Sequence, residues 1–221
     1  MNLDLKTRSA NYYNQWNNRP EMMQFIPKNA QKILDVGCAQ GLFGERLKKE
    51  LKAEVWGIEI DQKSAKKAQV RIDKVLIGDI SDLLDKIPND YFDCVIFNDV
   101  LEHLVDPYSL LKKIKSKLNL NGVVVCSLPN IRFFYTLKAL VLGKEWKYVD
   151  IGILDKTHLR FFTQKSIEDM FKILGYRILK LKGIHELHSW KFSLLNFLLF
   201  GALSDIKYSQ FACVAKPTKG A

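Results

Sequence analysis

The feature that most constrains the fold is the segment from Ile33 to Gly41, which reads Ile-Leu-Asp-Val-Gly-Cys-Ala-Gln-Gly. A short apolar run ends in a turn that contains Gly37 and Gly41, and an amphipathic pattern typical of a helix follows. A strand, a glycine-containing turn and a helix in this order are typical of a parallel sheet flanked by helices. At the carboxyl end of such a strand, bare backbone and helix-terminal amides can approach a ligand. The segment therefore predicts an α/β fold with a ligand site at this turn.

An acidic residue ends the next apolar run of the sequence. Glu59 closes the run that begins at Glu54, and it lies 18 residues after Gly41. In doubly wound sheets an acid at this place bonds the two hydroxyls of a ribose, which predicts a nucleotide-like ligand. The spacing disfavours a dinucleotide, because the position three after Ala39 is Leu42 rather than glycine or alanine.

The composition is that of one globular domain, which we expect to span residues 1–221. No apolar stretch reaches the 18 residues that a membrane-spanning helix needs, and the first residues have no apolar signal-peptide core. The cysteines form no Cys-x-x-Cys pair, so we expect no disulfide and no metal site, and a reducing cytoplasm is the expected location. These cysteines are Cys38, Cys94, Cys126 and Cys213.

The net charge of +10 raises nucleic acid or an anionic membrane as a partner. The lysines, however, are spread over predicted helix faces beside acids and aliphatic residues, and there is no arginine-rich tract. This distribution favours solvated helix surfaces, so nucleic acid stays an alternative partner that the pattern does not favour.

Strand-like and helical patterns alternate from residue 32 to about residue 127. Asp106-Pro107 predicts a helix start, and Asn121-Gly122 predicts a turn before the fifth strand. We expect strands at 32–36, 53–59, 73–78, 91–97, 122–128, 176–184 and 210–215, and helices at 41–52, 62–70, 107–118 and 166–174.

Three stretches lie outside this alternation: residues 1–30, 131–154 and 185–208. We expect the first to form an N-terminal cap and the other two to form helical, lid-like insertions over the ligand site, with Gly143 and Gly152 as hinges. The ten apolar residues 194–203 are too short to span a bilayer. They pack on the lid, or they contact a lipid-linked substrate or a membrane surface.

Several of these segments together resemble class I S-adenosylmethionine (SAM) dependent methyltransferases. The turn after Asp35 is similar to the family's Asp-x-Gly-x-Gly-x-Gly turn, with Ala39 in place of the middle glycine. The segment Leu101-Glu102-His103-Leu104-Val105-Asp106-Pro107 is similar to the Leu-Glu-His-x-x-Asp-Pro run of small-molecule methyltransferases such as those of ubiquinone synthesis. Asn119 to Val123 departs from the usual Leu-Lys-Pro-Gly-Gly. The resemblance covers roughly residues 30 to 175.

The resemblance implies a Rossmann-like, doubly wound, seven-stranded mixed sheet whose last strand is antiparallel, with SAM as cofactor. It implies that Glu59 accepts bonds from the two ribose hydroxyls and that Asp79 accepts a bond from the adenine amine. The positions that it assigns to the cofactor are Asp35, Gly37, Cys38, Ala39, Gly41, Glu59, Ile60, Asp79, Ile80 and Asn98.

The residues of catalysis are less constrained. His103 is a general base, a metal ligand beside Glu102, or a packing residue, and no Glu-x-x-His partner follows that would complete a metal site. The run Asp155-Lys156-Thr157-His158-Leu159-Arg160-Phe161-Phe162-Thr163 resembles one in methyltransferases near bacterial surface-polysaccharide genes. There His158 is a second candidate base and Arg160 a ligand for an anionic or sugar group, unless the run is only a rigid loop.

The acceptor is expected to be a hydroxyl of a sugar or another small molecule, with a lipid-linked molecule as a further option. Ser127-Leu128-Pro129-Asn130 ends the fifth strand and differs from the Asn-Pro-Pro-Tyr signature of amino-methylating DNA enzymes, which argues against base methylation. Two alternatives remain open, an RNA methyltransferase and a non-catalytic SAM-binding protein.

Overall fold

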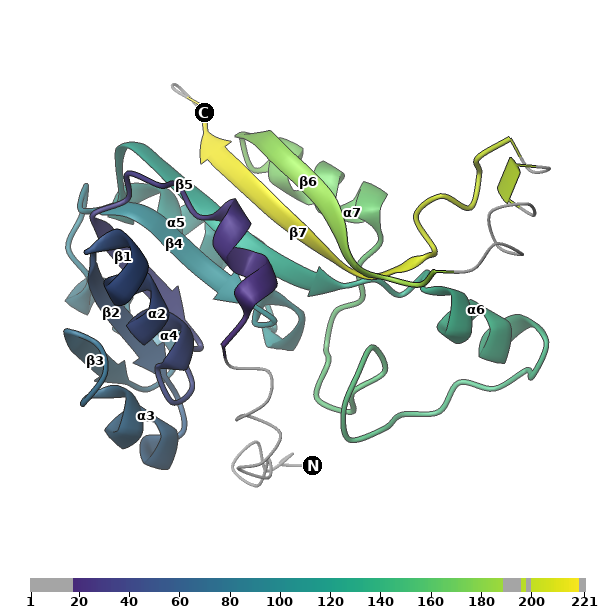
Figure 1. The fold of residues 1–221 in the computed structure, drawn as a ribbon, viewed down its shortest axis with the longest axis horizontal. Helices are drawn as coiled ribbons and strands as arrows, with labels where there is room; N and C mark the ends of the chain where they lie inside the picture. Colours follow the sequence, from purple (N-terminus) through teal and green to yellow (C-terminus); the bar gives the residue numbers. More distant parts are fainter. Residues whose placement is uncertain (1–17, 189–195, 198–199, 219–221) are drawn as a thin grey trace.

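The computed structural model describes residues 18–188, 196–197 and 200–218, and it contains a seven-stranded sheet in the order β3-β2-β1-β4-β5-β7-β6 (Figure 1). β7 pairs antiparallel with both β5 and β6, whereas the pairs among β1 to β5 are parallel. The predicted mixed sheet with an antiparallel last strand is therefore confirmed. The strands are β1 Lys32–Val36, β2 Glu54–Glu59, β3 Lys74–Ile77, β4 Phe92–Asn98, β5 Leu118–Pro129, β6 Tyr176–Glu186 and β7 Tyr208–Pro217.

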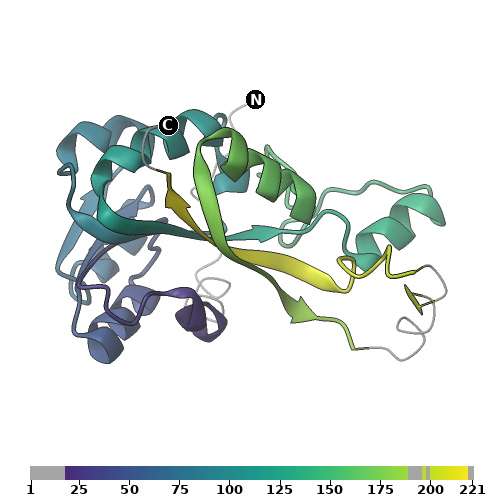
Figure 2. The ribbon, with the colours of Figure 1, turned by 90° about the horizontal axis from the view of Figure 1, so that it is seen from above.

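Helices cover both faces of the sheet and bury two separate cores (Figure 2). One core contains buried side chains of the 3-10 helix η2 (Pro20–Phe25), of α2 (Leu42–Leu51) and of α3 (Gln62–Ala68). The other contains side chains of α4 (Ile80–Leu83), α5 (Pro107–Ile114) and α7 (Gln164–Ile173). The remaining elements are η3 Leu84–Lys86, η4 Leu101–His103, η5 Lys115–Lys117 and α6 Phe134–Val141.

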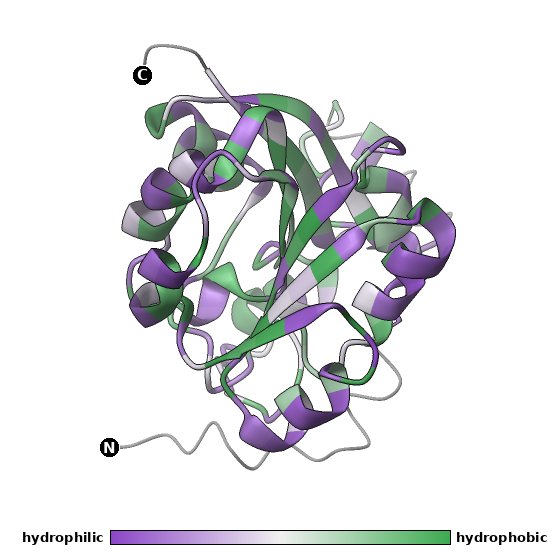
Figure 3. Cartoon of the chain, turned by 90° about the vertical axis from the view of Figure 1, so that its left-hand side faces the viewer, coloured by the Kyte–Doolittle hydropathy of each residue, from purple (hydrophilic) through white to green (hydrophobic). Residues whose placement is uncertain are grey.

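The alternation of side chains along each strand explains why two cores form. Ile33 of β1 enters the core beneath α2, while its neighbour Leu34 enters the core beneath α5. Cys94 and Val95 of β4 divide in the same way. Strands buried on both faces read as continuous apolar runs, and Figure 3 shows this hydrophobic colour in the strands with hydrophilic colour on the outer helices.

The helix starts follow local chemistry that the sequence displays. Asp106 caps α5 by accepting a hydrogen bond from the Ser109 amide at 3.0 Å, and Pro107 occupies the first turn as predicted. Thr163 and Ser166 form a reciprocal capping box at the start of α7.

Several boundaries differ from the sequence prediction. α5 ends at Ile114 rather than near 118, because Lys115–Lys117 form a 3-10 turn and Leu118 already begins β5. The turn predicted at Asn121-Gly122 is wrong: both residues lie inside β5, opposite an irregularity of pairing after Phe92. A Cβ at Gly122 would lie 2.6 Å from the Phe92 carbonyl oxygen, so the glycine is explained by a close backbone approach rather than by a turn.

The stretches outside the alternation have different structures. η2 buries Met22 and Phe25 against the sheet, whereas α6, in the 131–154 stretch, buries none of its residues. β6 and β7 extend into the 185–208 stretch, and they run toward the end of the molecule where α6 lies (Figures 1 and 2). The apolar run 194–203 falls partly outside the described residues. In the described part of the chain, no helix has both the length and the apolar character that crossing a bilayer requires.

Candidate active site

Two adjoining cavities open at the carboxyl ends of the parallel strands, where open α/β sheets bind ligands. The smaller, of about 200 Å³, is lined by the ends of β1 and β2 and by the loops after β3 and β4. The larger, of about 490 Å³, is lined by segments spread from Arg19 to Gln210. Both cavities share Gly37, Asp99 and His103, so one ligand can reach from the first space into the second.

The turn after β1 is fastened to β2 by backbone hydrogen bonds. The amides of Gly37 and Cys38 donate to the Ile58 carbonyl oxygen at 2.8 and 3.1 Å. Gly37 has a φ of 74°, and a Cβ there would lie 2.6 Å from Cγ2 of Val100. A glycine is therefore required at Gly37, and bare backbone forms the wall where the two cavities meet.

Glu59 holds the same turn through its side chain. One carboxylate oxygen accepts from the Ala39 amide and the other from the Asp61 amide, both at 2.8 Å. Burial raises the pKa of Glu59 and outweighs these two amides, which act in the opposite direction. Each carboxylate oxygen has a second acceptor site, so Glu59 can hold the turn and still accept ligand hydroxyls in the smaller cavity.

Asp35 is a buried carboxyl on the wall of the larger cavity. Burial and the charge of Glu59 raise its pKa to about 7, and the charge of Arg19 acts in the opposite direction. A cationic ligand group in this cavity would favour the ionised form of Asp35. The arrangement suits an ammonium or sulfonium group.

The other predicted cofactor residues divide between the two cavities. Ile60, Asp79 and Ile80 line the smaller one, and Asp79 also caps α4 by accepting from the Ser81 amide at 2.7 Å. Cys38, Ala39 and Asn98 line the larger one. Burial, together with the charges of Asp35 and Glu59, raises the pKa of the Cys38 thiol, which is therefore a small apolar group and not a nucleophile.

Gly41 is not among the residues that line either cavity. It precedes α2 with a φ of 76°, and a Cβ there would lie 2.9 Å from the Cα of Ala68. The glycine allows close packing of the turn against Ala68 of α3. Packing, rather than ligand contact, accounts for this glycine.

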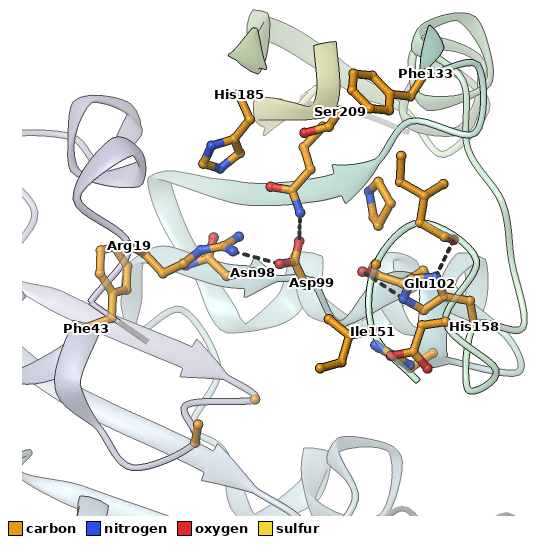
Figure 4. Close-up of a pocket in the computed structure, with 18 of the residues that line it drawn as sticks. Arg19, Phe43, Asn98, Asp99, Glu102, Phe133, Ile151, His158, His185 and Ser209 are labelled. Carbon is orange, nitrogen blue, oxygen red and sulfur yellow. Dashed lines mark hydrogen bonds and ion pairs between the residues drawn. The ribbon is translucent and has the colours of Figure 1, made fainter. Parts of the chain in front are cut away.

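A partly buried ionic network that the sequence did not indicate lies at the larger cavity (Figure 4). Nη1 of Arg19 lies 2.7 Å from Oδ2 of Asp99, and Oδ1 of Asp99 accepts from Ser127 at 2.8 Å and from Gln210 at 3.1 Å. Arg19 also donates to the Ser127 hydroxyl. Burial acts to raise the pKa of Asp99, but Arg19 and these hydrogen bonds outweigh it and hold the pKa below its ordinary value.

The only sequence signal for this network is polar residues in strands that are otherwise apolar. Ser127 in β5 and Gln210 in β7 are such residues, and Asp99 directly follows β4. Arg19 lies 80 positions before Asp99 and 108 positions before Ser127, just ahead of η2. Periodicity cannot pair residues at that separation.

Glu102, His103 and His158 come together on another wall of the larger cavity, with ligand-type atoms of all three within 4.8 Å of one another. The two histidine rings are 4.7 Å apart between centroids, and Nε2 of His158 lies 3.9 Å from Oε1 of Glu102. Figure 4 shows Glu102 and His158 side by side. Both candidate bases therefore line the same cavity. The prediction of no metal site rested on the absence of Cys-x-x-Cys and Glu-x-x-His motifs, and the fold brings a third side chain of ligand type, His158, to Glu102 and His103 from a distant loop.

Arg160 does not reach the cavity, although it follows His158 closely in the sequence. Its guanidinium donates to the Val105 carbonyl oxygen at 2.6 Å on the exposed side of the loop. Arg160 is therefore not among the residues that line the cavity, and its role as a ligand for an anionic or sugar group stays a prediction.

The remaining wall of the larger cavity comes from the stretches outside the sheet pattern. Phe133 and Ile151 come from the 131–154 stretch, and His185 comes from the start of the 185–208 stretch. Phe133 and His185 lie on the side opposite Ile151 in Figure 4. Each of the three stretches, including residues 1–30 through Arg19, thus contributes described residues to this wall.

Comparison with known proteins identifies relatives of this architecture. Residues 11–181 match the family model described as a methyltransferase domain. A ubiquinone biosynthesis O-methyltransferase from Histophilus somni is 30% identical over 141 residues, which cover 58% of this chain and 58% of that protein. The chain thus spans little more than half the length of that relative. A protein of the same name from Cereibacter sphaeroides is 26% identical over 176 residues, 76% of this chain and 70% of that protein.

Solved structures share the fold at lower identity. A structure described as a SAM-dependent methyltransferase from Archaeoglobus fulgidus has a TM-score of 0.69 at 23% identity, covering 89% of this chain and 91% of that chain. A structure described as a possible histamine N-methyltransferase from Thermotoga maritima has a TM-score of 0.63 at 17% identity, covering 94% and 95%.

Proposed function

The chain belongs to the methyltransferase domain family, and on that premise we propose that it transfers a methyl group from SAM to a hydroxyl of a small-molecule acceptor. The observation that carries the proposal is the shared wall of the two cavities. Gly37, Asp99 and His103 line both, so a cofactor in the smaller cavity would present its reactive end to the larger one.

The residues of the smaller cavity fit SAM. Glu59 would accept from the ribose hydroxyls, Asp79 would accept from the adenine amine, and Ile80 would pack on the ring. Asp35 and Asn98 would face the methionine end, where Asp35 compensates its positive charge. When bound, SAM supplies a methyl group on a sulfonium, which is already activated for transfer.

The size of the larger cavity favours a small acceptor over a polynucleotide. A space of about 490 Å³ lies in the range of small-molecule sites. Phe43 and Phe133 give it apolar surface, while Glu102 and Asp99 give it polar groups. A hydroxyl acceptor is suggested by the names of the curated relatives. A sugar hydroxyl or another small-molecule hydroxyl is the preferred class, with a lipid-linked molecule as a further option, and the buried free cysteines fit a reducing cytoplasm.

The chain would contribute position and proton removal. Holding the acceptor oxygen in line with the transferred methyl is the main source of rate, since the leaving group needs no further activation. His103, which lines both cavities, and His158 beside it are the candidates to receive the hydroxyl proton.

Titration calorimetry with SAM and with its demethylated product tests the cofactor, and NADH serves as the control ligand. We expect SAM to bind and NADH not to bind; tight NADH binding without SAM binding would overturn the proposal. Transfer of a labelled methyl group to sugars, lipid-linked sugars, phenols and RNA then tests the acceptor. Transfer to RNA with a steep salt dependence would replace the small-molecule assignment, and SAM binding with no transfer to any acceptor would favour a binding protein.

A further inference from the structure

Glu102, His103 and His158 form a compact group whose composition is that of a metal-binding site. We propose that these three side chains bind one divalent cation of the zinc class on the wall of the acceptor cavity. Glu102 and His103 belong to η4 at the end of β4, and His158 belongs to the loop before α7. The loop is tied to η4 by the amides of Leu159 and Arg160, which donate to the Glu102 carbonyl oxygen at 2.8 and 3.0 Å.

Both histidines are oriented by their second ring nitrogen. Nδ1 of His103 lies 3.2 Å from the Thr157 carbonyl oxygen, and Nδ1 of His158 lies 2.9 Å from the Ile153 carbonyl oxygen. A carbonyl oxygen only accepts, so each ring carries its proton on Nδ1 and its lone pair on Nε2. Backbone carbonyls that fix the tautomer in this way are the usual outer partners of metal-ligating histidines.

The buried carboxyl group of Asp155 in turn holds Thr157, the residue that orients His103. Oδ1 of Asp155 accepts from the amide and the hydroxyl of Thr157, at 2.8 and 2.7 Å. The Thr157 oxygen is thereby left to accept from Nδ1 of His103, which lies 3.1 Å away. Asp155 is 3% exposed, so a buried carboxyl group stands behind Thr157 and holds the partner of His103 in place.

The charge of Glu102 points in the same direction. Its side chain is 1% exposed on a wall of the cavity, and a carboxylate at such a place attracts positive charge. An ion pair with protonated His158 would need only one histidine. The geometry brings two histidines, both fixed on Nδ1, to the same carboxylate, which is better explained by a shared cation.

The spacing and the donor set select the class of cation. Ligands on bonds of about 2.1 Å are about 3–3.4 Å apart, so the present separations of up to 4.8 Å close with side-chain shifts of about 1 Å. Two imidazoles and one carboxylate suit zinc or a similar transition metal, whereas magnesium and calcium prefer oxygen ligands. Three protein ligands leave one position open, and His103 places it beside the cofactor cavity.

The role of the cation rests on the proposed function. An acceptor hydroxyl bound at the open position would be acidified and would release its proton to solvent. Its oxygen then forms a bond to the methyl carbon as the carbon–sulfur bond breaks, and the electron pair stays on the sulfur of the demethylated cofactor. In this arrangement the histidines act as ligands instead of as the general base, and the acceptor class narrows to hydroxyls that coordinate a transition metal.

Cobalt(II) is a suitable probe, because it substitutes for zinc and gives visible absorption bands that depend on its ligands. The full chain is stripped with a chelator and titrated with Co²⁺, and Zn²⁺ is then added in competition. Glu102→Gln and His158→Ala are the test variants. His188→Ala is the matched control, since His188 is an exposed histidine outside the group. Circular dichroism and SAM calorimetry on each variant report whether the fold is retained.

We expect one equivalent of Co²⁺ to bind to the unaltered chain and to His188→Ala, with displacement by Zn²⁺. The test variants should lose at least about 10- to 100-fold in affinity, which is the loss that outer partners alone produce. Absence of cobalt bands, or a Co²⁺ affinity in the folded test variants equal to that of the unaltered chain, would overturn the metal site. If the same proteins still bind SAM, the proposed function is unaffected. If the chain binds Co²⁺ but does not bind SAM, the metal site stands and the proposed function is overturned.

Discussion

The two cavities are built in different ways, although they share a wall. The smaller one uses residues at the ends of successive parallel strands, such as Val36, Glu59 and Asp79, each within a few positions of a predicted strand end. The larger one collects Arg19, His158 and Gln210 from segments that are far apart in the chain. A site made of strand ends is a consequence of the topology, while a site made of added segments can be rebuilt without altering the sheet. The comparison predicts that variants on the two sides separate cofactor binding from methyl transfer.

The largest expected effect is on the acceptor side. His103→Ala should reduce turnover by about 10²–10⁴-fold, the range for loss of an acid–base group, whether His103 takes the hydroxyl proton itself or holds a cation that acidifies the hydroxyl. SAM affinity should change little, because Gly37 and Asp99 still form the wall between the cavities. Turnover on the identified acceptor and SAM calorimetry measure the two quantities. If His103→Ala and His158→Ala both retain near-native turnover, neither histidine takes part in the reaction.

On the cofactor side, Glu59→Ala should weaken SAM binding by about 1–3 kcal/mol, the range for a hydrogen bond to a charged group. The same change releases the Ala39 amide, which adds to the loss. Glu54→Ala is the matched control, because Glu54 begins the same strand at the end remote from both cavities. Unchanged SAM affinity in Glu59→Ala would rule out the ribose assignment.

The pH dependence of SAM binding follows from Asp35. Burial and the charge of Glu59 raise the pKa of this carboxyl to about 7. A positively charged ligand favours the ionised form, so SAM affinity should fall about tenfold per pH unit as pH is lowered below 7. Calorimetry between pH 5 and pH 8 measures the slope. Asp35→Asn should bind weakly at every pH and show a flatter profile; an unchanged slope would assign the titration to another group.

The stability of the ligand-free protein should have the opposite dependence on pH. The pKa of Asp35 is about 7 in the folded state and near 3.8 when unfolded, so the folded state binds the extra proton between these values. Stability from this group should therefore decline as pH rises from about 4 to about 7. Urea unfolding of the unaltered chain and Asp35→Asn measures the difference, and parallel curves would contradict the assigned pKa.

The smallest effect concerns the added segments. Residues 1–30 or 131–154 should gain protection from hydrogen exchange when SAM or its demethylated product is added, because these stretches contribute Arg19, Phe133 and Ile151 to the cavity wall. Protection that changes only around 35–41, 59 and 79 would contradict their role as lids. It would also weaken the distinction between a fixed cofactor side and an adaptable acceptor side.

The parallel half of the sheet and the smaller cavity could be predicted because their signals are local. The apolar run before Gly37, the acid at Glu59 and the Asp106-Pro107 helix start each depend on a few neighbouring residues. The turn predicted at Asn121-Gly122 was wrong because a glycine after asparagine suits both a tight turn and a close backbone approach. Only the position of Phe92 in the folded chain distinguishes the two cases.

The larger cavity could be predicted only in part. His103 and His158 were recognised from their motifs, but their meeting depends on the loop that the Glu102 carbonyl anchors. The pairing of Arg19 with Asp99 has no signal in the periodicity of the sequence, because each residue lies outside the regular elements. The motif indicated that Arg160 lies near the cavity. Its guanidinium instead donates to the Val105 carbonyl oxygen on the exposed side of the loop.

The place of β7 in the sheet sets an order for biosynthesis. β7 follows the other six strands in the chain, yet it lies between β5 and β6. Until residues 208–217 leave the ribosome, both neighbours have an unpaired edge, and unpaired edges promote association with other chains. Gln210 of β7 also completes the bonds around Asp99. A nascent chain can therefore form the cofactor turn early, whereas the acceptor wall is completed only after synthesis of the final strand.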